Sequence, residues 1–282
     1  MRDIVRNRAA AAAALLACAA GAASAQQNAA ALGLNQSAWI QLQAYRPSIR
    51  SSGRLDDPNT GVQGTQISFE DELGLARRKT LGALLLGARF GRNWRAEFEY
   101  YSLSRSSART LSTSITVDDT VYPVSATVYS EFDSKVYRAG LGYSFYRTDA
   151  TEAGVAFGLH VTDFKVALEG TGAVAGTTVV ATRREEREKT VPLPTLGLYA
   201  TTALDARWML AGRADALYLR LHETRGTLVN LSANVLYRFT PNVGVGLGYR
   251  YVDYTLERTA SDQRGRVDYR FSGPQAFLDL GF

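Results

Sequence analysis

The sequence is poor in several residue types that mark common protein classes. Its 282 residues include one cysteine, two histidines and seven prolines. A single cysteine cannot form an intramolecular disulfide, so a disulfide-stabilised domain is excluded. After residue 20, no apolar run approaches the roughly 20 residues that a membrane-spanning helix needs. Helical membrane proteins are therefore excluded as well.

The first 25 residues have the three parts of an export signal. A start with three arginines is followed by an apolar stretch over residues 9–20 and by Ala23-Ser24-Ala25, an A-x-A cleavage site. We expect a signal peptide cleaved after Ala25, which leaves 29 basic and 26 acidic residues. That small positive excess is far from the footprint of a nucleic-acid-binding protein. Lipid attachment to Cys18 is the alternative, because the residues before it loosely resemble a lipoprotein box.

Alternating hydrophobicity dominates the rest of the chain. After a spacer over residues 26–36, we predict one β-domain over residues 37–282. In its last stretch Ala276, Leu278, Leu280 and Phe282 share one parity, which is typical of a strand with one apolar face. We expect about ten strands of this kind: 38–46, 79–90, 94–103, 136–147, from 152, from 195, 207–219, 227–239, 243–256 and from 265.

Short and long connections alternate between these strands. The short ones are tight turns at Gly91–Asn93, Thr148–Thr151, Asp205–Ala206 and Thr240–Asn242. We expect the long ones to be polar loops at 48–77, 104–131 (with a small hairpin around Asp118-Asp119), 170–189 and 258–264. Pro192 and Pro194 cannot donate ladder hydrogen bonds, so we place them at a strand rim. Short turns at one end and long loops at the other are typical of an outer-membrane barrel.

The sequence resembles small Gram-negative outer-membrane β-barrel proteins, of the general OmpA-barrel and OmpW type. The resemblance rests on the export signal, the alternation, the even strand number, the loop asymmetry and the terminal Phe282. The resemblance implies an all-β fold, a closed antiparallel up-and-down transmembrane barrel of about ten strands, with eight or twelve as alternatives. It also implies a bacterial outer-membrane location, no cofactor, and contact with outer-membrane lipids and lipopolysaccharide. The assembly machinery would read Leu278, Leu280 and Phe282. Oligomeric state stays open.

Two sets of residues are candidates for interface and lumen. Aromatic residues beside the tight turns predict a periplasmic girdle of Trp94, Phe145, Trp208, Phe239 and Phe282. Charged residues on the opposite parity lie at similar distances along their strands from the tight turns. They predict a layer inside the lumen: Glu97, Glu99, Arg138, His160, Arg213, Asp215 and Arg250. Such a layer is either structural filling by paired charges or a selectivity ring. Space beside inward glycines is expected to be filled by Tyr146, Tyr199 and the arginines.

The last strand contains a change of parity. Its apolar residues are odd-numbered up to Phe271 and even-numbered from Leu278. A continuous strand would turn one set the wrong way, and Gly273-Pro274 lies between the two sets. We therefore predict a β-bulge or break at Ser272–Pro274. If the strand is unbroken instead, Val267, Tyr269 and Phe271 stand above the membrane and face inward.

These features favour a narrow porin-like channel with a charge-lined lumen. A structural or surface-interaction barrel that acts through long loops is the first alternative, and a rim hydrolase is the second. No enzyme is expected: His160 has only Ser144 as a possible facing nucleophile, and His222 stands in a connection. The paired acidic motif and Asp-x-His spacing of the omptin proteases are missing. The acidic stretch Ser68–Glu72 fits no metal-binding loop, and we expect it to be solvated.

Overall fold

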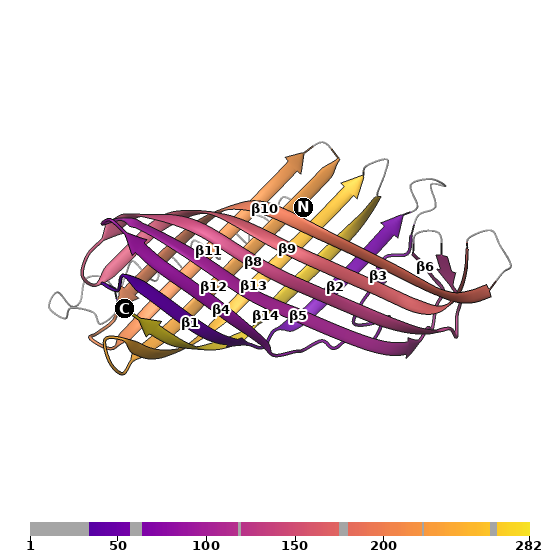
Figure 1. Cartoon of the computed structure of the whole chain (residues 1–282), viewed down its shortest axis with the longest axis horizontal. Coiled ribbons are helices and arrows are strands. Elements are labelled where there is room, and N and C mark those ends of the chain that lie inside the picture. The colour runs from indigo at the N-terminus through magenta and orange to yellow at the C-terminus, as the bar shows by residue number, and fades with distance from the viewer. Residues whose placement is uncertain (1–33, 57–63, 118–119, 175–179, 222, 260–263) are drawn as a thin grey trace.

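A computed structural model describes residues 34–56, 64–117, 120–174, 180–221, 223–259 and 264–282 (Figure 1). Within these ranges the chain is all β and its strands form one sheet. The expected signal peptide and most of the expected spacer lie outside them. The strands are β1 (Ala38–Tyr45), β2 (Ser48–Asp56), β3 (Ile67–Ser68), β4 (Leu81–Phe90), β5 (Trp94–Thr110), β6 (Ile115–Val117), β7 (Thr120–Tyr122), β8 (Thr127–Arg147), β9 (Thr151–Val174), β10 (Val180–Ala203), β11 (Trp208–Leu221), β12 (Thr224–Arg238), β13 (Val243–Thr259) and β14 (Arg264–Gly281).

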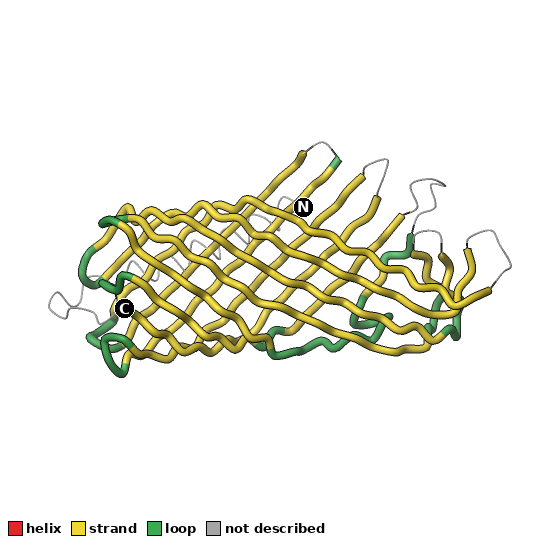
Figure 2. Tube along the Cα trace, in the orientation of Figure 1, coloured by secondary structure: helices red, strands yellow, loops and turns green. Residues whose placement is uncertain are grey.

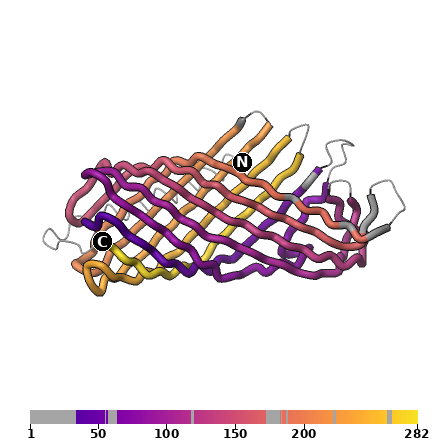
Figure 3. The backbone as a smooth tube through the Cα atoms, viewed as in Figure 1, coloured from indigo at the N-terminus to yellow at the C-terminus, as the bar shows by residue number. Residues whose placement is uncertain are grey.

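The sheet closes into an antiparallel barrel with ten strand positions, as the alternation predicts. β1 pairs with β14 from Trp39↔Gly281 to Tyr45↔Gln275 and with β4 on its other edge. β2 continues the line of β1 and pairs with the remainder of β14, so β1 and β2 share one position (Figure 3). The backbone N–H of Phe282 donates to the carbonyl of Ala38 at 2.8 Å, which completes the closure.

The two ends of the barrel differ. The four tight turns gather at one end, here called the turn end, together with Leu34 and Phe282 (Figure 2). At the opposite loop end β8, β9 and β10 project farthest, with 21, 24 and 24 residues. A membrane-spanning strand needs only about 9–11 residues. More than half of β9 and of β10 therefore extends beyond the length that a bilayer requires.

Several segments expected to be polar loops are strands instead. β2 occupies the first part of the expected loop 48–77, and β9 and β10 reach far into the expected loop 170–189. Pro192 and Pro194 lie inside β10 and not at its rim. β10 pairs with β9 along nearly its whole length, but its pairing with β11 begins only at Leu196↔Ala216. The prolines thus sit where β10 has one free edge, and a missing N–H costs no ladder bond there.

The predicted bulge in the last strand is wrong. β14 keeps an unbroken register with β13 from Arg264 to Leu280. The interruption falls in the neighbouring strand position instead, between β1 and β2 at Arg46–Pro47. A Cβ on Gly273 would lie 2.5 Å from the carbonyl oxygen of Arg46, so this close approach requires glycine. Tyr269 and Phe271 are buried and face the barrel interior.

The turn-end half of the barrel carries a belt of outward apolar side chains. Exposed members of the belt are Leu42, Leu86, Phe98, Leu141, Val155, Phe157, Leu159, Leu196, Leu198, Val235, Val245, Leu247 and Leu278. A bulge between Ser144 and Tyr146 turns both Phe145 and Tyr146 outward. Tyr146 therefore does not fill the lumen as expected. Among the described residues, no helix is long and apolar enough to cross a membrane.

The interior of the loop-end half is an apolar core. Aromatic rings from opposite walls meet there: Phe132 of β8 lies 5.3 Å from Tyr269 of β14, and Phe164 of β9 lies 5.5 Å from Tyr254 of β13 (ring centroids). All four rings are buried. Since Phe132 and Phe164 face Tyr254 and Tyr269 across the barrel, the core fills the space between the two walls.

Candidate functional site in the barrel interior

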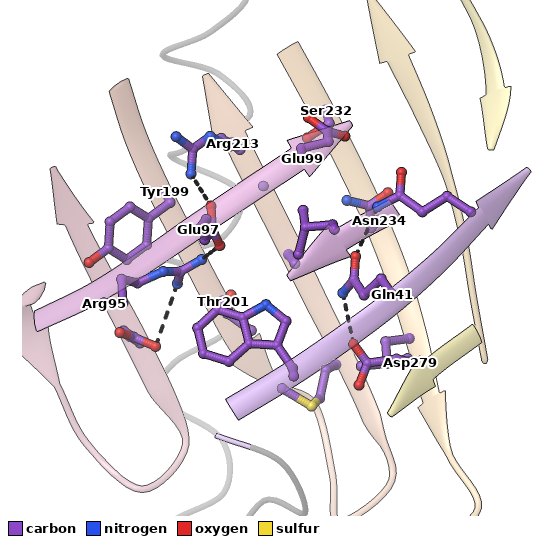
Figure 4. Close-up of a pocket in the computed structure, with 18 of the residues that line it drawn as sticks. Gln41, Arg95, Glu97, Glu99, Tyr199, Thr201, Arg213, Ser232, Asn234 and Asp279 are labelled. Atoms are coloured by element: carbon purple, nitrogen blue, oxygen red, sulfur yellow. Dashed lines mark hydrogen bonds and ion pairs between the residues drawn. The ribbon is translucent and has the colours of Figure 1, made fainter. Parts of the chain in front are cut away.

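Charged side chains from several strands meet at mid-height in the interior. Glu99 of β5 accepts hydrogen bonds from Arg138 Nε at 3.0 Å and from Arg250 Nη1 at 2.6 Å. Glu97, two residues earlier, accepts from Arg213 Nη1 at 2.6 Å (Figure 4). β5 is not a neighbour of β11 or β13, so the bridges from Arg213 and Arg250 cross the lumen.

The network continues along the far wall. Arg213 Nε donates to Asp215 Oδ2 at 2.8 Å, and Asn230 Nδ2 donates to the same oxygen at 3.2 Å. Arg250 Nε donates to Asn230 Oδ1 at 3.1 Å. The side chains of Glu99, Asp215 and Arg250 are each at most 5% exposed. Each carboxylate of this layer is therefore paired with at least one arginine in a largely buried environment.

The structure brings six of the seven residues proposed for the lumen into this one network. The seventh, His160, is buried in β9 directly opposite Arg138, and its Nδ1 has no hydrogen-bond partner among the described residues. Ser144 does not face His160, because it pairs with Gly154 in the ladder while His160 pairs with Arg138. That catalytic pairing is wrong. His222 lies outside the described residues.

A second polar layer, nearer the turn end, escaped the sequence analysis. Glu152 accepts from Arg89 Nη1 at 2.6 Å and from the hydroxyl of Ser144, and Tyr199 Oη lies 2.9 Å from Ser144 Oγ. The guanidinium of Arg95 stands 4.1 Å from the centre of the Tyr199 ring (Figure 4). The signal was available, since Arg95 shares the parity of Glu97 and Glu99 on β5.

Glycines make room for the filling residue that the sequence predicted. Cβ atoms on Gly142 and Gly154 would lie 2.9 and 2.3 Å from atoms of the Tyr199 ring. Tyr199 is 3% exposed and occupies the lumen at this height. Gly142 of β8 and Gly154 of β9 thus leave the space that the Tyr199 side chain of β10 fills.

A small cavity remains in the interior and is lined by residues of both polar layers, among them Glu99, Arg213 and Tyr199. Its volume is about 160 Å³, and Trp39, Gln41 and Asn234 are among the residues that line it. Leu34 packs against Met209 and neighbouring apolar side chains in this part of the interior. Among the described residues, no three His, Cys, Asp or Glu side chains are placed to hold a metal ion.

A buried ion pair in the loop-end half involves Glu70, which was expected to be solvated. Glu70 lies in the segment between β3 and β4 and is 7% exposed. Its Oε1 accepts from Arg105 Nη1 at 2.5 Å and from Ser51 Oγ at 2.7 Å, and its Oε2 accepts from the Ser51 backbone N–H at 2.7 Å. Arg105 also donates to the carbonyl of Ala76 at 3.2 Å. These bonds tie the segment between β3 and β4 to Ser51 of β2 and Arg105 of β5.

The girdle and assembly residues lie on the outside. Side chains of the proposed girdle are 43 to 63% exposed: Trp94, Phe145, Trp208, Phe239 and Phe282. Trp94 packs on Tyr143 and Trp208 packs on Tyr237, with ring centroids 5.1 and 4.9 Å apart. Leu278 and Leu280 point outward on β14 beside them. Their role as a girdle and an assembly signal stays a prediction.

Comparison with solved structures identifies the fold. The outer membrane protease OmpT from Escherichia coli superposes with a TM-score of 0.55 at 11% identity, over 86% of this chain and 97% of that one. The transport unit of the autotransporter AIDA-I from E. coli gives 0.43 at 9% identity (88% and 91% covered), and the attachment invasion locus protein Ail of Yersinia pestis gives 0.34 at 10% (86% and 99% covered). No protein-family model and no curated protein matches the sequence.

The chain therefore has the fold of the bacterial outer-membrane β-barrels. The closed ten-strand architecture is the one that its resemblance to small outer-membrane barrels implies. At 11% identity the likeness to OmpT establishes this fold and no shared activity.

Proposed function

We propose that this chain is a bacterial outer-membrane barrel without a wide aqueous pore, which acts as a rigid platform at the cell surface. Its export signal would be removed after Ala25, and the turn end would face the periplasm. Catalysis is not part of the proposal. The closed interior makes the surface-interaction alternative stronger than the porin that the sequence favoured.

The observation that carries the proposal is the filled interior of the loop-end half. The rings of Phe132, Phe164, Tyr254 and Tyr269 meet across the lumen, directly above the charge layer. Water and ions would have to pass both an apolar core and a set of cross-lumen ion pairs. Either obstacle alone opposes conduction, because protein interiors are packed too densely to admit a water column.

The length of the loop-end sheet supports a surface role. β9 and β10 each have 24 residues, whereas a bilayer needs about 9–11. Glu131, Lys165 and Arg184 lie on the outer face of this projecting sheet, and cross-strand ion pairs link its charges. A stiff sheet held well above a membrane can present such a face to a partner.

Planar-bilayer recording of the purified barrel tests the proposal. We expect silence, or only rare small events, from the native chain and from a Glu99→Ala variant, because the apolar core closes the lumen independently of Glu99. A stable, large conductance in the native protein would refute the closed interior and make the chain a general porin.

A narrow anion channel is the second candidate. The interior layers hold six arginines and five carboxylates: Arg89, Arg95, Arg138, Arg213, Arg238 and Arg250, with Glu97, Glu99, Glu152, Asp215 and Asp279. This excess of one positive charge would favour anions. Small anion-selective events that lose selectivity in Arg250→Ala would support the channel over the platform.

A further inference from the structure

The outer face of the barrel carries an apolar groove. It has a volume of about 920 Å³ and crosses the strands from β5 to β11. Residues of one lateral row line it, each paired with the next in the ladder: Tyr100, Leu84, Leu42, Leu278, Val245, Tyr237 and Trp208. The groove therefore lies within the apolar belt that would meet lipid chains.

Small residues form the floor of the groove. The next row toward the loop end contains Gly82, Ala44 and Ala276, which pair side by side on β4, β1 and β14. A Cβ placed on Gly82 would meet no atom within 4 Å, so open space lies over this position.

Basic side chains stand at the loop-end border of the groove. Arg46 occupies the gap between β1 and β2, two residues after Ala44. Arg78 forms an isolated backbone β-bridge with Ser48, the first residue of β2. Arg50 and Arg270 follow, directly opposite each other on β2 and β14. Arg46, Arg50 and Arg78 are exposed.

Three of these four arginines form no ion pair with a described carboxylate. In the part of the chain that the structure describes, no carboxylate forms an ion pair with Arg46, Arg50 or Arg78, whereas Arg270 pairs with Asp253 at 2.7 Å. Like charges placed opposite each other on adjacent strands, as Arg50 and Arg270 are, destabilise a sheet. Asp253 offsets part of this repulsion through its pair with Arg270, and an anion bound at Arg50 would reduce the rest.

Tyrosines mark the height of the border. Tyr249 and Tyr251 point outward on β13, and the Tyr251 hydroxyl donates to Asp253 at 2.7 Å. Aromatic residues with one polar end favour the boundary between lipid chains and headgroups. The arginines at and above this row are therefore placed at headgroup level, with the groove below them at acyl-chain level.

We propose that this face binds one phosphorylated glycolipid of the lipid A type, with its acyl chains in the groove and its phosphates on Arg46, Arg50 and Arg78. The guanidinium group binds phosphate in a bidentate manner, so unpaired arginines suit this headgroup. A molecule with several chains and two phosphates matches a wide groove with several basic residues better than a two-chain phospholipid does. The proposal rests on the outer-membrane placement proposed above, and not on the closed lumen.

The test uses the full chain, purified in detergent and incubated with equimolar lipid A and phosphatidylglycerol, with bound lipid counted by native mass spectrometry. We expect lipid A retention to fall at least tenfold in an Arg46→Ala/Arg78→Ala double variant. Gly82→Trp, which fills the groove, should cause a similar loss while the fold, checked by circular dichroism, is kept. Arg184→Ala is the matched control, since that exposed arginine is already paired with Glu169 and Glu186.

Three results would overturn the site: native retention of lipid A in both the double variant and Gly82→Trp, an equal loss in Arg184→Ala, or equal retention of phosphatidylglycerol by the native chain. A failure of the native barrel to insert into lipid vesicles would instead refute the membrane placement. Conduction in the bilayer assay would leave the lipid site unaffected, so the two proposals fail separately.

Discussion

Replacing Glu99 with alanine should strongly destabilise the barrel. Its carboxylate joins Arg138 and Arg250, with N–O distances between 2.6 and 3.1 Å, and its side chain is 3% exposed. Glu99→Ala leaves both guanidinium groups buried. Arg138 then keeps only Glu97, at 3.4 Å, and Arg250 keeps only Asn230 as a polar partner from the layer.

The expected size of the effect follows from the remaining contacts. Removing one partner of a buried ion pair costs about 3–5 kcal/mol, because the charge left behind is uncompensated. Here two cations share the loss, and the cavity that Arg138 and Arg250 line lets some water reach them, so we expect about 3 kcal/mol. Removing Arg250 as well should recover part of this, so Glu99→Leu/Arg250→Leu should lose less than the sum of the single variants.

Equilibrium urea unfolding in phospholipid vesicles, followed by tryptophan fluorescence, measures the free energy of unfolding. Glu186→Ala is the control, because Glu186 pairs with Lys165 and Arg184 on an exposed face and should change stability little. A loss below about 1 kcal/mol in Glu99→Ala, or strict additivity in the double variant, would show that the cross-lumen network does not act as a buried, coupled unit.

Three further changes test other parts of the fold by the same unfolding measurement. Gly154→Val should cost about 1–3 kcal/mol because its Cβ meets the Tyr199 ring, whereas Gly82→Val, over open space, should cost far less. Phe132→Ala should cost about 3–5 kcal/mol by leaving a cavity in the loop-end core, and an unchanged midpoint would contradict that core. The backbone N–H groups of Arg207 and Trp208 lower the pKa of Asp205, so its stabilisation is present above about pH 4, the unfolded value, and is lost as the pH falls through the lowered value. Asp205→Asn should flatten this acid dependence, and an unchanged pH profile would refute the linkage.

The sequence alone determined the fold class and the facing of most strands. Period-two alternation is a local property of an extended backbone, so it placed Glu97 and Glu99 inward and Leu278 outward without any knowledge of partners. Tight turns are local as well, which is why the four connections at the turn end and the barrel's closure could be predicted. The even strand count followed from these two signals.

The segments mistaken for loops show where local pattern fails. In β2, Ile49 faces inward while Arg50 and Arg54 face outward, so the alternation is intact but its faces are exchanged. Within the apolar belt, the outward side chains are apolar and the inward ones are polar. Toward the loop end, beyond the belt, the outward side chains are polar and the inward ones are apolar. The same exchange in β14, between Leu278 and Phe271, resembled a bulge. Parity cannot distinguish a slipped register from a change of surroundings.

Only the tertiary structure decided which interior residues meet. Arg250 reaches Glu99, 151 residues away, and Arg213 reaches Glu97 across the lumen because strand tilt and register bring β5 opposite β11 and β13. Parity tells whether a side chain faces the lumen or the outside. It gives neither the height of that side chain along the barrel axis once the strands tilt nor the residue that it contacts across the lumen. Three other features depend on the same closure, which brings distant strands side by side. They are the absence of ion pairs to Arg46 and Arg78 among the described residues, the open space over Gly82, and the aromatic rings that fill the loop-end half.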